Sequence, residues 1–341
     1  MTHRRPTMND VARAAGVSLK TVSRVVNGEL TVDPALAARV RAAIGSLNYR
    51  RHLGASMLRR KDRRTGTIGL LVEDVGNPFS AALHRAVEDE ARARGVHVLA
   101  GSLDEDPDRE RDLVRAFARR HADGLILAPA GPDQGYLAAD LPPDVPVVFV
   151  QRPATGFAGD CVLARDAAGA VRAVRHLIAY GHRRIAFLGG RADAATTGER
   201  RRGYLSAVDA AGLRPFMIDG LRGSQAAEAV TRNLFRRPRP PTALFTGRNL
   251  ITIGAVRALR LLDRHRDAAL VGFDDFPLAD LLEPAVTVIA QDPAEMGRAA
   301  ARALLERIDG ETAEPREISI ATTLIPRGSG ELRPQVRATG S

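Results

Sequence analysis

Several residue types are scarce in this sequence, and each shortage excludes a class of structure or site. Cys161 is the only cysteine, so the chain can form neither an internal disulfide nor a cluster of thiolate metal ligands. No run of about 18 apolar residues occurs, which excludes a membrane-spanning helix, and the start MTHRRPTMNDV lacks the apolar core of a signal peptide. Tryptophan is absent and aromatic residues make up only 4%, so cores must be built from Ala, Val, Leu and Ile. We therefore expect a cytoplasmic protein without cofactor, metal or membrane contact, with Cys161 as a small core residue.

Positive charge is concentrated at one end of the chain. Residues 1–64 contain fourteen Lys or Arg and four acids, and this surplus equals the net charge of the whole chain, +10. The remaining residues are therefore neutral overall. A short basic head on a neutral body is typical of a nucleic-acid-binding domain, because binding to phosphates releases condensed counterions. A solvated basic face or a membrane-surface patch is the alternative interpretation.

Residues 7–47 are predicted to form three short helices. Thr7 and Ser18 can cap the first two, and Asp33 followed by Pro34 is typical of the start of the third. In the second helix, LKTVSRVVN, the valines fall on one side, and the other side carries Leu19, Lys20, Ser23 and Arg24. A helix that buries valines and presents basic residues after a glycine turn suits a recognition helix in the DNA major groove. An ordinary amphipathic surface helix would show the same periodicity.

The chemistry of this face fits base recognition. Lys20 and Arg24 can donate to guanine O6 and N7, and Leu19 can contact a thymine methyl group. The segment MNDVARAAGVSLKTVSRVVNG (8–28) resembles the signature of the LacI/GalR repressor family. The resemblance implies that Leu19, Lys20 and Arg24 discriminate between operators. The predicted DNA-binding set in this domain also includes Thr21 and Ser23, which can reach phosphates, together with Thr7, Ser18 and Asn27.

The basic segment 48–64 is predicted to contain a hinge that folds on operator DNA, as the resemblance implies. Within it, Leu58 would wedge into the minor groove beside Ala55, and Arg59 would contact phosphate. The alternative for Leu58 is a helix residue packed on the body. The segment departs from the usual hinge at Arg51 and His52, and at Gly54, which weakens helix propensity by roughly 1 kcal/mol relative to Ala. These expectations divide the chain into a helix-turn-helix domain (1–50), a hinge (51–64) and a ligand-binding and dimerisation domain (65–341).

From Thr65 onward, short apolar runs alternate with amphipathic stretches, which indicates parallel sheets covered by helices. The predicted strands are 67–72, 96–101, 124–128, 147–151, 184–190, 243–247 and 269–273, and the predicted helices include 78–94, 167–180, 199–211 and 252–262. Segments such as GHRRIAFLGG (181–190), VGFDD (271–275) and TTLIPRGS (322–329) resemble family landmarks. The resemblance implies a periplasmic-binding-protein-like core of two doubly wound parallel-sheet lobes. Its crossovers would fall near 161–165, 289–293 and 320–324.

The candidate ligand-binding residues follow strand ends, where open α/β sheets bind ligands. Arg200 and Asp274 match the family's ligand-binding arginine and acid; a surface ion pair is the alternative for Arg200. Asn77 and Phe79 follow the first strand, where a helix cap and a core residue are equally good interpretations. The set is completed by Gln151, Arg248 and Gln291. Gln151 and Arg248 stand where the family usually has an acid and an Asn, and two arginines in one cleft would favour an anionic or acidic-sugar ligand.

The sequence thus predicts a homodimeric repressor that binds a pseudo-palindromic operator and responds to a small metabolite of the sugar or sugar-derivative class. A dimer is favoured over a tetramer because the C-terminal end, GELRPQVRATGS, lacks leucine heptads. Regulation by a corepressor or a protein partner is the first alternative, and a binding protein without a DNA function is another. An enzyme is disfavoured because GxSxG, Walker and GxGxxG motifs are missing.

Overall fold

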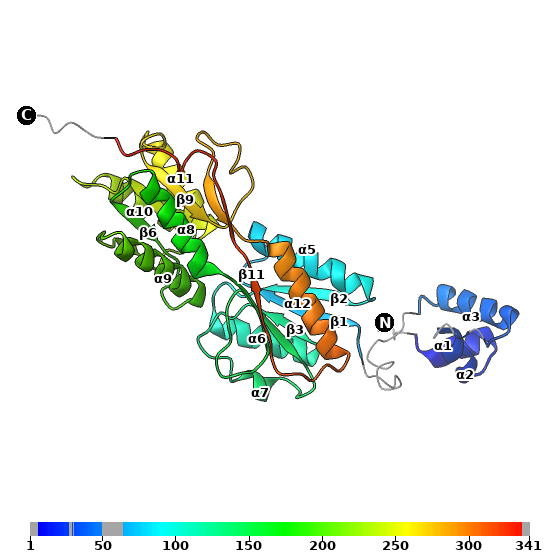
Figure 1. Ribbon diagram of the computed structural model, residues 1–341. Coiled ribbons are helices and arrows are strands. Elements are labelled where there is room, and N and C mark those ends of the chain that lie inside the picture. Colours follow the sequence, from blue (N-terminus) through cyan, green and yellow to red (C-terminus); the bar gives the residue numbers. More distant parts are fainter. Residues whose placement is uncertain (1–5, 27–28, 30, 50–63, 336–341) are drawn as a thin grey trace, which may run out of the picture. The chain divides into compact units, whose positions relative to one another are not determined.

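The computed structural model describes residues 6–26, 29, 31–49 and 64–335. The chain divides into two compact units, Met1–Thr65 and Gly66–Ser341 (Figure 1). The first unit contains helices α1 (Met8–Ala15), α2 (Leu19–Val26) and α3 (Pro34–Ser46). Within the described residues, no helix is both long and apolar enough to cross a membrane.

Local side-chain caps start the helices of the small unit. Thr7 and Asp10 form a reciprocal capping box at α1, and Asp33 accepts hydrogen bonds from two backbone amides at α3. Gly16 ends α1 with φ 62°, a left-handed conformation that suits glycine. The three helices then enclose a small core that contains the fully buried side chains of Val11, Val22 and Val40. The helices predicted between residues 7 and 47 are therefore present.

The first lobe of the large unit is a six-stranded sheet with the order β11-β5-β4-β3-β1-β2, in which all neighbours are parallel. Apolar strands fill its centre, and helices α5 and α12 cover one face while α6 and α7 cover the other. The strands are β1 (Thr67–Val72), β2 (His97–Ser102), β3 (Leu125–Leu127), β4 (Val147–Val150), β5 (Asp160–Ala164) and β11 (Glu317–Ile320). The helices are α5 (Pro78–Ala93), α6 (Pro107–Arg119), α7 (Leu137–Asp140) and α12 (Pro293–Ile308).

The second lobe repeats this plan with the sheet order β12-β10-β9-β8-β6-β7, in which only β12 runs antiparallel to its neighbour. Helices α8 and α9 cover one face, and α10 and α11 cover the other. The strands are β6 (Ile185–Leu188), β7 (Met217–Ile218), β8 (Ala243–Thr246), β9 (Ala269–Phe273), β10 (Thr287–Ala290) and β12 (Thr323–Ile325). The helices are α8 (Asp166–Ala179), α9 (Ala195–Ala210), α10 (Gly223–Phe235) and α11 (Asn249–Leu261).

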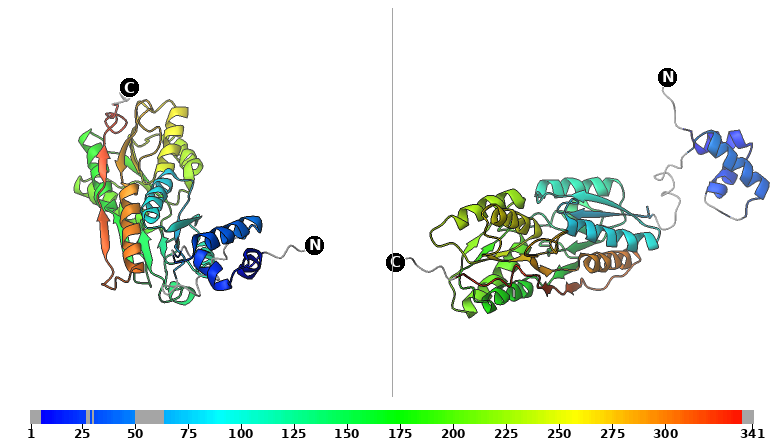
Figure 2. Two further views of the ribbon diagram at one scale, coloured as in Figure 1. Left: turned by 90° about the vertical axis from the view of Figure 1, so that its right-hand side faces the viewer. Right: turned by 90° about the horizontal axis from the view of Figure 1, so that it is seen from above.

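The chain passes between the lobes three times, after β5, after β10 and after β11 (Figures 1 and 2). The strands next to these crossings are β5 and β11 at one edge of the first sheet and β10 and β12 at one edge of the second. The carboxyl ends of the parallel strands consequently face the region between the lobes, where ligands of such sheets bind. The predicted fold class, a helix-turn-helix domain followed by a two-lobed α/β core, is confirmed.

Candidate functional site

The second helix of the small unit presents the face predicted to read DNA. Val22 is fully buried, whereas Leu19, Lys20 and Arg24 are exposed. Ser18 accepts a hydrogen bond from the Thr21 amide at 3.1 Å and shares a second with the Thr21 hydroxyl at 2.9 Å, so these two side chains hold the start of α2. The Nε atom of Arg24 lies 3.5 Å from a carboxylate oxygen of Glu29 at the surface. The helix therefore separates a core side from a basic, solvent-facing side.

The remaining residues predicted to bind DNA fall into two groups. Thr7 and Ser23 lie within the described residues, and the Thr7 hydroxyl donates to the Asp10 carboxylate at 2.7 Å as part of the cap. Asn27, Ala55, Leu58 and Arg59 lie outside the described residues. The structure thus gives Thr7 a capping role and leaves the hinge predictions as predictions.

In the second lobe, at the carboxyl ends of its strands, Arg200 of α9 is the centre of a buried cluster. Its Nε donates to the Asp166 carboxylate at 2.7 Å, and one terminal nitrogen donates to the Gly247 carbonyl at 2.6 Å and to Asp274 at 3.2 Å. Its guanidinium also stacks on the Phe273 ring, with 3.8 Å between the guanidinium carbon and the ring centroid. The side chain of Arg200 is only 5% exposed. Arg200 is therefore a buried cation paired with two acids rather than part of a surface ion pair.

The two acids of this cluster differ in position. Asp274 follows β9 in a left-handed conformation with φ 68° and also accepts a hydrogen bond from the Gln291 amide. Such a conformation is strained for a residue other than glycine, and strain of this kind gathers at functional sites. Asp166 begins α8, and its burial raises the pKa of its carboxyl to about 6, although the Arg200 guanidinium opposes the shift. The Asp166 carboxyl therefore binds a proton more tightly than an ordinary aspartate does.

A polar contact joins the two lobes at Asn77. Its side-chain amide donates to the Asn249 oxygen at 3.3 Å and accepts from the Asn249 amide nitrogen at 2.8 Å. The same Asn77 oxygen accepts the Phe79 amide at 3.0 Å, so Asn77 also caps α5. Phe79 is only 8% exposed and packs into the core of the first lobe. Of these two candidates, Asn77 reaches the region between the lobes, whereas Phe79 offers little surface to a ligand.

Arg248, at the start of α11, takes part in a ring of four charged side chains. It donates to Glu73 and, at 2.8 Å, to Glu105, and both acids belong to the other lobe. Arg152, also of the first lobe, donates to Glu73 at 3.3 Å and to Glu105 at 3.2 Å. Cations and anions therefore alternate around this ring, called here the Arg248 ring. The carboxylates of Glu73 and Glu105 hold the pKa of Arg248 above its usual value, although burial lowers it.

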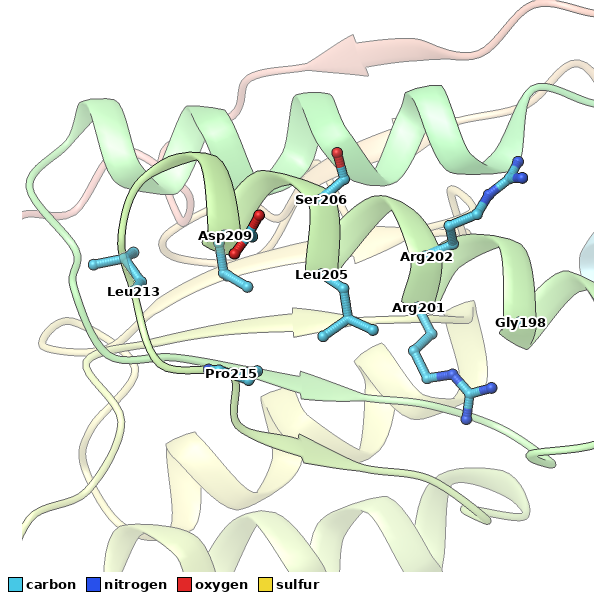
Figure 3. A pocket seen from close by; sticks show the side chains of 9 residues that line it. Gly198, Arg201, Arg202, Leu205, Ser206, Asp209, Leu213 and Pro215 are labelled. Carbon is cyan, nitrogen blue, oxygen red and sulfur yellow. The ribbon is translucent and has the colours of Figure 1, made fainter.

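Two cavities lie near these clusters. One, of about 660 Å³, borders the crossing after β5 and is lined by Gln151, Asp166 and Thr196 among others. Gln151 also has a left-handed conformation, with φ 64°. The other cavity, of about 610 Å³, runs along α9 and is lined by Arg201, Leu205 and Leu213 (Figure 3). It contains none of the predicted ligand residues, so the first cavity is the better ligand candidate.

Comparison with known proteins agrees with both units. Residues 7–52 match the family model for bacterial regulatory proteins of the lacI family, and residues 174–330 match the periplasmic binding protein-like domain. The ribose operon repressor of Escherichia coli K12 is 33% identical over 331 residues, which cover 95% of this chain and 99% of that repressor. The chain belongs to the LacI family. It is a DNA-binding transcription regulator with the helix-turn-helix unit at its N-terminal end.

Two solved structures of LacI-family proteins show the same fold. One, a complex of the transcriptional regulator CelR with cellobiose, is 32% identical and matches with a TM-score of 0.70 over 95% of this chain and all of that one. The other, the lac repressor dimer bound to operator and the anti-inducer ONPF, is 25% identical. It matches with a TM-score of 0.82 over 96% of this chain and 99% of that one.

For this LacI-family chain, the structure brings together part of the predicted ligand set. Arg200, Asp274 and Gln291 form one cluster, Arg248 lies in another, and Gln151 lines the cavity near Asp166. Three acids that the sequence analysis did not select, Asp166, Glu73 and Glu105, are direct partners of these arginines. Glu73 directly follows β1, so the rule that selected Asp274 after β9 would also have found it.

The structure does not support the predicted preference for an anionic ligand. That expectation was based on Arg200 and Arg248 lying together in one cleft. Each of them has two carboxylate partners in the structure, Asp166 and Asp274 for Arg200, and Glu73 and Glu105 for Arg248. Paired guanidiniums offer little attraction to an anion, because the field of each one is cancelled locally. The arginines therefore give no ground for preferring an anionic ligand.

Among the described residues, no group of three His, Cys, Asp or Glu side chains is placed to hold a metal ion.

Proposed function

We propose that this chain is a homodimeric repressor whose affinity for a pseudo-palindromic operator is controlled by an uncharged sugar bound between the lobes, without catalysis. The main support for a sugar as the ligand is the Arg200 cluster. It combines a buried cation, two acids and an amide at the carboxyl ends of the strands, close to a cavity of about 660 Å³. Sugar hydroxyls both donate and accept hydrogen bonds, and the carboxylates, the amide and the guanidinium of this cluster offer acceptors and donors to them. The cluster holds one more acid than cations, which favours an uncharged ligand over an anion.

The names of relatives suggest which sugars to test. The relatives include a ribose operon repressor and a regulator crystallised with cellobiose, so D-ribose and cellobiose are the first probes. The side chains proposed to hold the sugar are Arg200, Asp274, Gln291, Asn77 and Gln151, together with Asp166. Corepression, in which the sugar strengthens operator binding, is the alternative that the same experiment separates from induction.

The test has two steps. Selection from random duplexes with the full-length chain should enrich a pseudo-palindrome, and the selected duplex then serves in gel shifts with increasing D-ribose or cellobiose. We expect one of the sugars to change the operator affinity by 5–150-fold, which corresponds to a coupling of about 1–3 kcal/mol. Ribose 5-phosphate serves as the charged control and should act more weakly. Enrichment of no palindrome, or equal responses to all three compounds, would contradict the proposal.

The proposed dimer leads to a prediction for the loop after β9. Leu278 and Leu281 are large apolar side chains that are 64% and 73% exposed in the single chain, and a second copy would bury them. Leu281→Asp should weaken the dimer by at least about tenfold, because burying one leucine contributes roughly 1.5–3 kcal/mol. Sedimentation velocity over a concentration series measures this change. Met217→Asp, at an exposed position of β7, is the control and should leave the dimer unchanged; dimerisation of Leu281→Asp at wild-type strength would argue against this surface.

A further inference from the structure

The two acids of the Arg248 ring lie on the side of the cleft away from the three crossings. The members of the ring follow β1, β2 and β4 in the first lobe and β8 in the second, whereas the crossings use β5, β11, β10 and β12. In the first sheet, β1 and β2 form the edge opposite to β11, and in the second, β10 and β9 separate the central strand β8 from β12. Contacts far from the crossings resist separation of the two lobes most effectively, because the lobes move furthest apart there when they rotate about the crossings.

The ring joins the lobes through Arg248 alone. Glu73, Glu105 and Arg152 all belong to the first lobe, so the two ion pairs that cross the cleft are those of Arg248 with the two acids. All four side chains are less than one-fifth exposed. The Arg191 guanidinium, which also comes from the second lobe, donates to the Glu105 carbonyl and adds a third contact to the same place.

We infer that the Arg248 ring is a latch that holds the two lobes closed when no effector is bound. With Arg248 in place, the ring contains two cations and two anions and is neutral. Without it, Glu73 and Glu105 share only Arg152, so an unbalanced negative charge remains in a nearly dry contact. Burying an unpaired charge is strongly unfavourable, and separation of the lobes lets water reach it. The inference rests on the proposed function only in placing the effector in this cleft.

The latch has a consequence for effector binding. If the closed state excludes the effector, the apparent dissociation constant is the intrinsic one divided by the fraction of molecules that are open. The ring would then set how much effector is needed for a response, without contacting the effector itself. A member of the same family that lacks the arginine at this position would respond at lower concentration.

The test measures the distance between the lobes directly, in the full chain without sugar or DNA. Spin labels are attached at Asp112→Cys on α6 and Gln225→Cys on α10, both exposed positions, in a Cys161→Ser background. The Arg248→Gln variant is compared with the unaltered ring by double electron–electron resonance. The labelled chain is mixed with an excess of unlabelled chain, so that a dimer carries labels on one copy only. We then expect one narrow distance distribution with the intact ring, and an increase of about tenfold or more in the ratio of open to closed molecules without Arg248.

Matched variants keep the result interpretable. Arg232→Gln removes the same charge from an exposed pair within α10 and should leave the distribution unchanged. Arg248→Lys keeps the charge but lacks the planar fork that contacts two carboxylates, so it should give an intermediate distribution. Glu73→Gln serves if Arg248→Gln does not fold, and it should open the lobes too. A broad distribution with the intact ring, or an unchanged one in Arg248→Gln and Glu73→Gln, overturns the latch. Neither outcome bears on whether a sugar controls operator binding.

Discussion

Replacing Lys20 and Arg24 together by alanine should remove most of the preference for the operator over random duplex. Both side chains project from α2 on the face opposite to buried Val22. A bidentate contact to a guanine contributes roughly 1–3 kcal/mol of discrimination, and a dimer would lose two such contacts in each half-site. We expect the ratio of specific to non-specific affinity to fall by at least about a hundredfold, measured by fluorescence anisotropy at fixed salt concentration.

The salt dependence separates base contacts from phosphate contacts. The logarithm of the affinity for random duplex is plotted against the logarithm of the salt concentration. If the two side chains read bases, the slope of this plot should change little in the double variant. Arg41→Ala removes an exposed positive charge from α3 and is the matched control. It should weaken binding to all duplexes alike and keep the preference for the operator. An equal loss of affinity for operator and random duplex in the double variant would show that α2 is not the reading helix.

The ion pair that Arg24 forms in the absence of DNA affects how much operator preference the double variant loses. Its 3.5 Å ion pair with Glu29 is exposed at both partners, and such pairs contribute little to stability. DNA can therefore displace Glu29 at small cost, and the arginine remains available for base contact.

Features that depend on neighbouring residues were predictable from the sequence. Thr7, Ser18 and Asp33 were predicted as caps, and each accepts the backbone amide hydrogen bond of a cap. The runs TIGLLV and ALVGF were predicted as strands 67–72 and 269–273, and β1 and β9 have these bounds. Local hydrogen bonds and apolar runs are written within a few residues of sequence, so periodicity and composition suffice to find them.

Other strands gave a weaker signal. β11, with the sequence EISI, lies at a sheet edge and alternates between exposed and half-buried residues, and β7 contains only two residues. Neither was named as a strand, because no continuous apolar run marks it. β12 and β10 were noted only as part of the crossovers. Edge strands are covered on fewer sides, and their sequences consequently carry less of the pattern on which prediction depends.

The ion-pair partners at the cleft were not predictable from local sequence. Asp166 is 34 residues from Arg200, and Glu73 is 175 residues from Arg248. Whether an arginine in a cleft is free to bind an anion depends on such distant acids, and a sequence reveals them only once the strand order is known. For this reason the sequence pointed to the two arginines but not to their acid partners, and the ligand charge inferred from them lost its support.

The second large effect is expected at Arg200. Arg200→Met keeps much of the side-chain volume but leaves Asp166 and Asp274 buried without their cation, and removing one partner of a buried pair costs about 3–5 kcal/mol. For a unit of this size, that lowers the melting temperature by roughly 10 °C, which scanning calorimetry measures. The variant should also lose the response of operator binding to the sugar. Arg202→Met is the control, because Arg202 pairs with Glu199 at the surface, and its melting temperature should stay close to that of the wild type.

The pH dependence of this loss tests its cause. Burial already raises the folded-state pKa of Asp166 to about 6, above the ordinary aspartate value. A carboxyl with a raised pKa binds a proton more tightly in the folded state, so its contribution to stability falls as pH rises from about 4 to about 6. Without Arg200 that pKa rises further, because the favourable charge is gone and the burial remains. The difference in melting temperature between Arg200→Met and wild type should therefore be smaller at pH 5 than at pH 8. An equal difference at both pH values would mean that lost packing on Phe273, rather than the uncompensated acids, causes the destabilisation.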